Sequence, residues 1–126
     1  MKILVVEDSK FLRVAVERAL ARANYTVICA SDGEEALRIA REALPDAILL
    51  DMLLPKLSGQ EVLKALKKDP ATAAIPVIVL TSLSQKNAKQ LEKDGAAAYF
   101  EKSTLLLDKA SESILAAVKN VLPQPA

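Results

Sequence analysis

The sequence contains no histidine and only one cysteine, Cys29. Without histidine the chain cannot build a Ser-His-Asp triad, a histidine acid–base or a His-ligated zinc site. A single cysteine cannot close an internal disulfide or form a thiolate zinc site, and the apolar neighbours of Cys29 predict a small core residue. This cysteine usage fits the reducing cytoplasm, where we expect the protein to work.

Glycine is also scarce, and neither sign of charge is in excess. There are 3 glycines, 17 basic and 16 acidic side chains among 126 residues. A balanced charge does not favour direct binding of nucleic acid or of a membrane surface. No apolar run is long enough to cross a membrane, and the first residues predict a strand rather than a signal peptide. With 52% hydrophobic residues, the length suits one domain with one core.

Short apolar runs alternate with amphipathic stretches along the whole chain. Strands are predicted at 2–6, 25–30, 47–50, 76–80 and 97–100. Helices are predicted at 9–22, with Ser9 as N-cap, at 34–43, 58–68 and 85–93, and from 104 or 105 to about 121. Strands separated by helices must be parallel. Placing the most apolar strands at the centre favours the order 2-1-3-4-5, an α/β, flavodoxin-like (βα)5 three-layer sandwich.

Three carboxylates stand where two of these strands end. Glu7 and Asp8 follow the first strand, and Asp51 follows the third. In an open parallel sheet, ligands bind at the carboxyl ends of the strands, in the crevice where the strand order reverses. Three acids there would repel one another unless a cation lay among them, and Mg²⁺ prefers such oxygen ligands. The sequence therefore predicts a metal site in which one acid is a candidate nucleophile.

Two more polar residues end strands at the same edge. Thr81 follows the fourth strand, and Lys102 closely follows the fifth. Phosphoryl transfer chiefly needs positioning and neutralisation of charge on the phosphoryl oxygens, which a metal, a hydroxyl and an ammonium provide. Taken singly, each residue has a plainer explanation as a turn former, a strand end or a surface charge. Their agreement at four strand ends favours the functional interpretation.

The residues Val5–Ser9, Leu50–Pro55 with Gly59, and Val79–Ser82 followed by Lys102 resemble the receiver domain of two-component response regulators. The resemblance covers about Lys2–Leu122, so the receiver domain is expected at 1–122, and 123–126 would be a tail or the start of a linker. It implies that Asp51 is the phosphoacceptor and that Thr81 and Lys102 bind the phosphoryl group. It also implies a switch pair, Thr81 and Tyr99, and a site for Mg²⁺, or Mn²⁺ in its place, made by Glu7, Asp8, Asp51 and the backbone carbonyl of Leu53.

The same resemblance implies a regulatory domain rather than an enzyme with an external substrate. The phosphoryl group would come from a sensor histidine kinase or a phosphotransfer protein. The domain would catalyse only its own phosphoryl transfer and dephosphorylation. Phosphorylation would change the surface made by the fourth helix, the fifth strand and the fifth helix, and so regulate a downstream protein partner or a fused output domain.

The chain departs from the family at Ser103, where proline commonly follows the lysine. A cis bond before a residue other than proline costs about 2.5–4 kcal/mol, so we expect a trans Lys102–Ser103 bond. A second feature concerns the lifetime of the phosphoryl group. Leu53 and Leu83 lie two residues after Asp51 and Thr81. Our hypothesis is that these apolar side chains hinder the attacking water and prolong that lifetime.

Three alternatives come from other functional classes. A haloacid-dehalogenase-like phosphatase would need a second acid at position 53, where Leu53 stands. A flavodoxin-like cofactor binder would need a Gly-, Ser- and Thr-rich phosphate loop after the first strand, where Glu7 and Asp8 would repel a phosphate. A degenerate receiver could act as a phosphorylation-independent scaffold. The complete acid set and Lys102 disfavour this scaffold, whereas Ser103 keeps it open.

Overall fold

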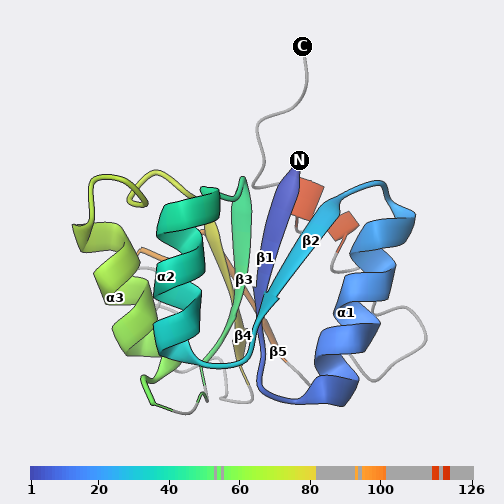
Figure 1. Ribbon diagram of the computed structural model, residues 1–126, viewed down its shortest axis with the longest axis horizontal. Helices are drawn as coiled ribbons and strands as arrows, with labels where there is room; N and C mark the ends of the chain where they lie inside the picture. Colours follow the sequence, from blue (N-terminus) through green and yellow to red (C-terminus); the bar gives the residue numbers. More distant parts are fainter. Residues whose placement is uncertain are drawn as a thin grey trace.

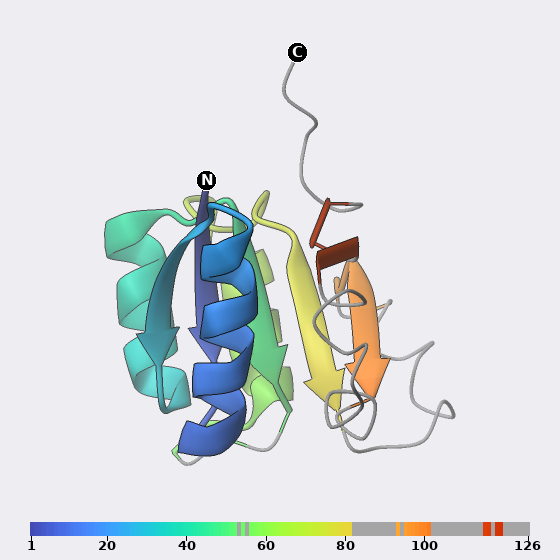
Figure 2. The same cartoon turned by 90° about the vertical axis from the view of Figure 1, so that its right-hand side faces the viewer.

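The computed structural model describes residues 1–52, 54, 56–81, 93, 95–101, 115, 116, 118 and 119, with the backbone alone for 81 and 99–101. A five-stranded parallel sheet has the order β2-β1-β3-β4-β5 (Figures 1 and 2). The strands are β1 Lys2–Val6, β2 Thr26–Ala30, β3 Ala47–Asp51, β4 Val77–Thr81 and β5 Ala98–Glu101. The helices are α1 Lys10–Arg22, α2 Gly33–Ala43 and α3 Gly59–Lys68.

The predicted fold class is confirmed, and the strand limits differ by a residue or so. β2 begins at Thr26 rather than Tyr25, and β3 includes Asp51. Asp51 belongs to the strand because it pairs in register with Leu80 of β4. Most of the predicted helices 85–93 and 104–121 lies outside the described residues. Lys93 and the four described residues from 115 to 119 are helical, as expected.

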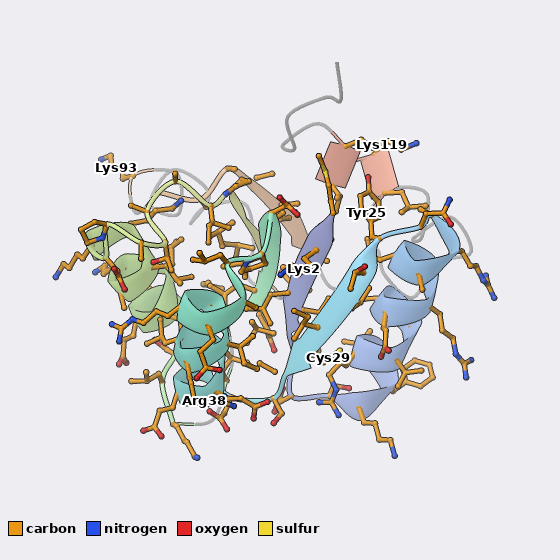
Figure 3. All side chains as sticks on the ribbon, turned by 45° about the horizontal axis from the view of Figure 1, so that its top comes forward. Lys2, Tyr25, Cys29, Arg38, Lys93 and Lys119 are labelled. Carbon is orange, nitrogen blue, oxygen red and sulfur yellow. The ribbon has the colours of Figure 1, made fainter. Side chains whose placement is uncertain are left out.

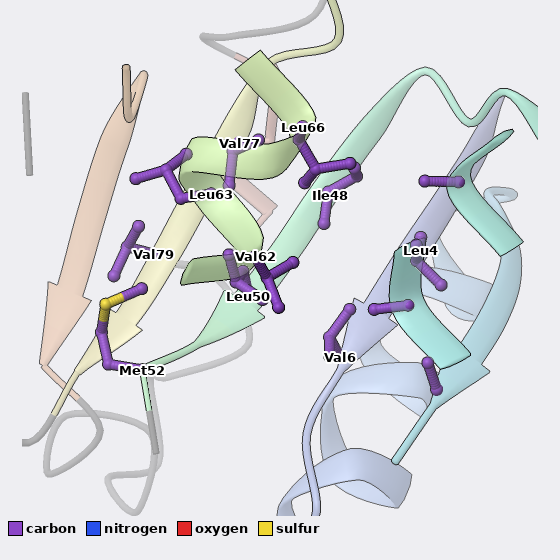
Figure 4. Packing of buried hydrophobic residues seen from close by; sticks show 13 residues of the cluster. Leu4, Val6, Ile48, Leu50, Met52, Val62, Leu63, Leu66, Val77 and Val79 are labelled. Atoms are coloured by element: carbon purple, nitrogen blue, oxygen red, sulfur yellow. The ribbon is translucent and has the colours of Figure 1, made fainter. Parts of the chain in front are cut away.

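Helices cover both faces of the sheet (Figure 1). On one face α2 and α3 pack on a buried cluster that includes Leu4, Val6, Leu50 and Val79 (Figure 4). On the other face the cluster joins strand residues to Val16 and Leu20 of α1, and to Val118. Successive residues of β1 and β3 point to opposite faces, so both faces are apolar, which is typical of central parallel strands.

Polar side chains set the starts of the helices. The Asp32 carboxylate accepts a hydrogen bond from the backbone N–H of Glu35 at 2.8 Å and caps α2. Ser58 caps α3 in the same way. Ser9 occupies the predicted N-cap position of α1, but its side chain makes no cap hydrogen bond. Its backbone N–H donates instead to the Glu7 carboxylate, at 3.2 Å.

Cys29 is half-buried rather than a full core residue. It packs at the margin of the cluster beneath α1, and its thiol lies 3.7 Å from the Glu17 carboxylate (Figure 3). Burial, followed by the negative charge of Glu17, raises the pKa of the Cys29 thiol to about 11. The thiol is therefore protonated and weakly reactive at neutral pH. Among the described helices, none is long and apolar enough to cross a membrane.

Candidate functional site

The structure brings the three acids at the strand ends together. Glu7, Asp8 and Asp51 each offer one carboxylate oxygen, and these oxygens all lie within 4.8 Å of one another. Their proximity follows from the register, because Val6 pairs with Leu50 and the chain then continues into Glu7 and Asp51. The crevice between β1 and β3 is the place where the strand order reverses.

Two of these acids are buried. Glu7 and Asp51 are 0% exposed, whereas Asp8 is exposed at the rim. Several buried charges of the same sign are unfavourable unless a cation compensates them. Mg²⁺ holds oxygen ligands at about 2.0–2.1 Å in an octahedron, so opposite ligands lie about 4 Å apart. Three carboxylate oxygens this close together could serve as ligands of such an ion, and Asp8 lies at the exposed side of the crevice.

The close approach of Gly59 fixes the backbone of Asp51. The Met52 N–H donates to Leu80 at 3.1 Å, and the Gly59 N–H donates to Met52 at 3.0 Å. A Cβ atom on residue 59 would collide with the backbone oxygen of Asp51 and lie 2.5 Å from the Cα of Met52. Only glycine therefore allows the start of α3 to pack here. In the sequence, Gly59 was recognised only as part of the receiver motif, and its close contact with the backbone of Asp51 was not predicted.

Three hydrogen bonds from different segments hold Glu7. Its backbone N–H donates to Ala30 of β2 at 3.1 Å, and its carboxylate accepts from Ser9. Arg13 Nη1 of α1 donates to the Glu7 backbone oxygen at 2.9 Å. The sequence did not indicate Arg13, because an arginine one turn into a helix has no signature that separates it from a surface charge.

A second group of charges lies on the loops that follow β2 and β3. Lys56 Nζ lies 3.6 Å from Asp32 Oδ2 and 3.8 Å from Glu34 Oε2. The hydrogen bond from the Glu35 backbone, and to a smaller extent the Lys56 charge, lowers the pKa of Asp32. With Arg38 these residues line a hollow of about 330 Å³. The ion pairs connect the loop after Asp51 to the start of α2.

The remaining predicted site residues are placed only in part. Thr81 ends β4, directly after the residue that pairs with Asp51. Tyr99 lies in the neighbouring strand β5 and pairs with Val79 of β4. Thr81 therefore lies on the strand next to that of Asp51, and Tyr99 lies one strand further away. The side chains of both residues lie outside the described part of the chain. Leu53, Lys102, Ser103 and Leu83 are also outside it, so their roles stay predictions.

Comparisons with known proteins give the family. A model of the response regulator receiver domain matches residues 3–111. The chain is 43% identical over 90 residues to the alkaline phosphatase synthesis transcriptional regulatory protein PhoP of Bacillus subtilis, covering 71% of this chain and 37% of that protein. It is 37% identical over 101 residues to the polar-differentiation response regulator DivK of Brucella anthropi, covering 79% and 82%. Several other relatives are also matched over only about a third of their length.

Solved structures agree with this assignment. A putative response regulator from Chloroflexus aurantiacus has a TM-score of 0.87 at 31% identity, covering 98% of both chains. The chemotaxis protein CheY4 of Vibrio cholerae has a TM-score of 0.85 at 32% identity, covering 96% of this chain and 98% of that chain. The Mn²⁺-bound form of response regulator Rcp1 has a TM-score of 0.83 at 29% identity, covering 99% of both chains. With this fold and acidic crevice, the chain belongs to the receiver domain family of two-component response regulators.

Proposed function

We propose that the chain is a phosphorylation-dependent switch in which Asp51 accepts a phosphoryl group. The observation that carries the proposal is the crevice itself. Asp51 lies buried at the end of a central strand, with Glu7 and Asp8 supplying further carboxylate oxygens within 4.8 Å. In this proposal Glu7, Asp8, Asp51 and the Leu53 carbonyl hold Mg²⁺, or Mn²⁺ in its place. The bound ion would neutralise the acids and the phosphoryl oxygens.

The transfer is a displacement at phosphorus. A carboxylate oxygen of Asp51 attacks, and a new P–O bond forms while the P–N bond of a donor phosphohistidine breaks. The electron pair of that bond stays on the imidazole nitrogen of the donor, which takes up a proton. The Thr81 hydroxyl and the Lys102 ammonium would receive the phosphoryl oxygens. Movement of Thr81 and Tyr99 would then shift the output surface, a two-state change biased by local charge.

The partners follow from the family. The donor would be a sensor histidine kinase or a phosphotransfer protein in the cytoplasm, and the target a downstream protein or a fused output domain. The Bacillus subtilis relative is named a transcriptional regulatory protein, and the match covers 37% of it, which supports a fused output domain. The Brucella anthropi relative is named a response regulator and is covered over 82%, which supports action as a separate protein.

Among the described residues, the outer face of α1 is the surface that we propose for contact with the phosphodonor. Phe11 is 74% exposed and, with Lys10, Val14, Ala15 and Arg18, lines a hollow of about 420 Å³. α1 starts two residues after Asp8, so a protein bound there would stand beside the crevice. The basic rim suits a partner helix with apolar and acidic residues. Phe11→Ser should reduce transfer from a kinase that phosphorylates the wild type and leave transfer from acetyl phosphate unchanged.

Incubation with Mg²⁺ and acetyl phosphate tests the central step, with intact mass as the readout. The wild type should gain the mass of one phosphoryl group, and the gain should need Mg²⁺. Asp51→Asn should lose the gain, whereas the control Asp46→Asn, at the opposite edge of the sheet, should keep it. A folded wild type that gains no mass from any small phosphodonor would refute the proposal and favour the phosphorylation-independent scaffold.

A further inference from the structure

Arg13 reaches from α1 to the end of β1. Its Nη1 donates to the backbone oxygen of Glu7 at 2.9 Å, and its side chain is partly buried. Arg13 also lies close enough to Cys29 of β2 for its charge to lower the pKa of that thiol, against the larger effect of burial. Cys29 pairs with Val5 in the register of β1 and β2. The guanidinium therefore lies over the ends of both strands, on the face that α1 covers.

The Glu7 carbonyl lies beyond the end of strand β1, and Arg13 is the residue that donates a charged hydrogen bond to it there. The last residue of β1 is Val6, and the N–H of Glu7 makes the next hydrogen bond to Ala30. The following residue, Asp8, is already exposed in the turn that leads to α1. A charged hydrogen bond is shorter and stronger than a neutral one. Arg13 thus holds the peptide that joins the two metal-binding acids.

We propose that Arg13 is a positioning residue for the cation site, acting through the Glu7–Asp8 peptide. The inference rests on the receiver function proposed above. Arg13 touches neither the phosphoryl group nor the cation in this proposal. It holds the Glu7 and Asp8 carboxylates in the orientation that the ion requires, as partners behind metal ligands commonly do.

The charge of Arg13 and its hydrogen bond to Glu7 should affect Mg²⁺ affinity in opposite directions, which makes the proposal testable. A cation near the acids repels Mg²⁺, so if charge alone mattered, its removal would tighten Mg²⁺ binding. The positioning bond has the reverse effect, and its removal would loosen Mg²⁺ binding. Loss of a partner of this kind typically weakens metal affinity by about tenfold or more.

The experiment compares Mg²⁺ binding by calorimetry in the wild type, Arg13→Met and the control Arg22→Met. Arg22 is exposed in the last turn of the same helix. Arg13→Met should bind Mg²⁺ about tenfold more weakly, and Arg22→Met should bind as the wild type does. In the Mg²⁺-free proteins, the amide NMR signals of Glu7 and Ser9 should move in Arg13→Met and stay in place in Arg22→Met.

The outcomes separate this inference from the proposed function. Unchanged or tighter Mg²⁺ binding in a folded Arg13→Met protein would overturn the role of Arg13 and leave the receiver function standing. A wild type that binds no Mg²⁺ would overturn the proposed function itself. Arg13→Gln, which keeps a polar side chain too short for the contact, has the same two outcomes and replaces Arg13→Met if that variant does not fold.

Discussion

The charged groups are arranged differently at the two edges of the sheet, where the strands begin (the amino edge) and where they end (the carboxyl edge). At the amino edge the backbone N–H of Lys2 donates to the Asp46 carboxylate at 2.7 Å, and the Lys2 ammonium donates to Ala43 at 3.0 Å (Figure 3). At the carboxyl edge Glu7, Asp8 and Asp51 bring carboxylate oxygens within 4.8 Å of one another. At the amino edge, the carboxylate of Asp46 and the carbonyl of Ala43 accept hydrogen bonds from Lys2. The carboxyl edge brings three acids together, an arrangement that costs stability and that, in the proposed function, serves to bind a cation.

The largest expected effect is at the carboxyl edge, where the backbone leaves no room. Gly59→Ala places a Cβ against the backbone of Asp51 and Met52. We expect a loss of about 1–3 kcal/mol in the free energy of unfolding, since overpacking must shift that backbone. Mg²⁺ affinity should fall as well. Urea unfolding and calorimetry check both, with exposed Lys64→Ala on the same helix as the control. A Gly59→Ala protein with unchanged stability and Mg²⁺ affinity would show that the packing of residue 59 against Asp51 and Met52 can accommodate a methyl group.

The next effect concerns how long the carboxyl edge keeps its phosphoryl group. The sequence predicts that Leu53 and Leu83 flank the route of the water that attacks at Asp51. Under that hypothesis, Leu53→Asn and Leu83→Glu each introduce a polar group that can orient this water. We expect hydrolysis of the aspartyl phosphate to become about tenfold faster, which corresponds to ~1.4 kcal/mol in the barrier. The loss of phosphoryl mass over time gives the rate. Leu44→Asn, at an exposed position of the amino edge, is the control. Unchanged rates in both variants would end this hypothesis.

At the amino edge, removal of an acid should cost stability and spare function. Asp46→Ala deletes the acceptor of the Lys2 N–H at an exposed site. We expect a loss of about 0.5–1.5 kcal/mol in the free energy of unfolding, the usual worth of such a bond. Mg²⁺ affinity and phosphorylation by acetyl phosphate should equal those of the wild type. A changed Mg²⁺ affinity would mean that the two edges are coupled.

The smallest effect is a pH dependence, also at the amino edge. The Asp69 carboxylate accepts from the backbone of Ala71 at 3.0 Å and from Arg41 at 2.8 Å. These hydrogen bonds lower the pKa of Asp69 below its ordinary value. The ionised Asp69 carboxylate therefore stabilises the folded state at pH values above the ordinary pKa of an aspartate. This stabilisation is lost as the pH falls through the lowered pKa of the folded state. Urea unfolding between about pH 5 and pH 2 should be less pH-dependent in Asp69→Asn than in the wild type. Equal slopes would contradict the assignment.

The sequence was sufficient to predict the sheet order, because the apolar runs of β1, β3 and β4 identify the strands that are buried on both faces. It also predicted that Glu7, Asp8 and Asp51 would meet, since the ends of parallel strands share one edge. These predictions depend on regular geometry. The limits of the strands were less certain, because Asp51 and Tyr25 are assigned by pairing rather than by composition.

The contacts that support the site could not be predicted in the same way. The hydrogen bond of Arg13, the ion pairs of Lys56 and the close approach of Gly59 each join segments whose distance is set by the packed fold. Ser9 is another example. It occupies the N-cap position that local rules predict, yet its hydroxyl makes no cap hydrogen bond, and its backbone N–H donates to the Glu7 carboxylate.

The most direct test of the contrast between the edges is the free energy of unfolding with and without Mg²⁺, in the wild type, Asp8→Asn and Asp46→Asn. Mg²⁺ at about 100 times its dissociation constant should stabilise the wild type and Asp46→Asn by about 2.7 kcal/mol. Without Mg²⁺, Asp8→Asn should be more stable than the wild type by about 1 kcal/mol, because one repulsive charge is gone. Mg²⁺ should stabilise it far less. Equal responses to Mg²⁺ in all three proteins, or no response in any, would contradict a cation site made by these carboxylates.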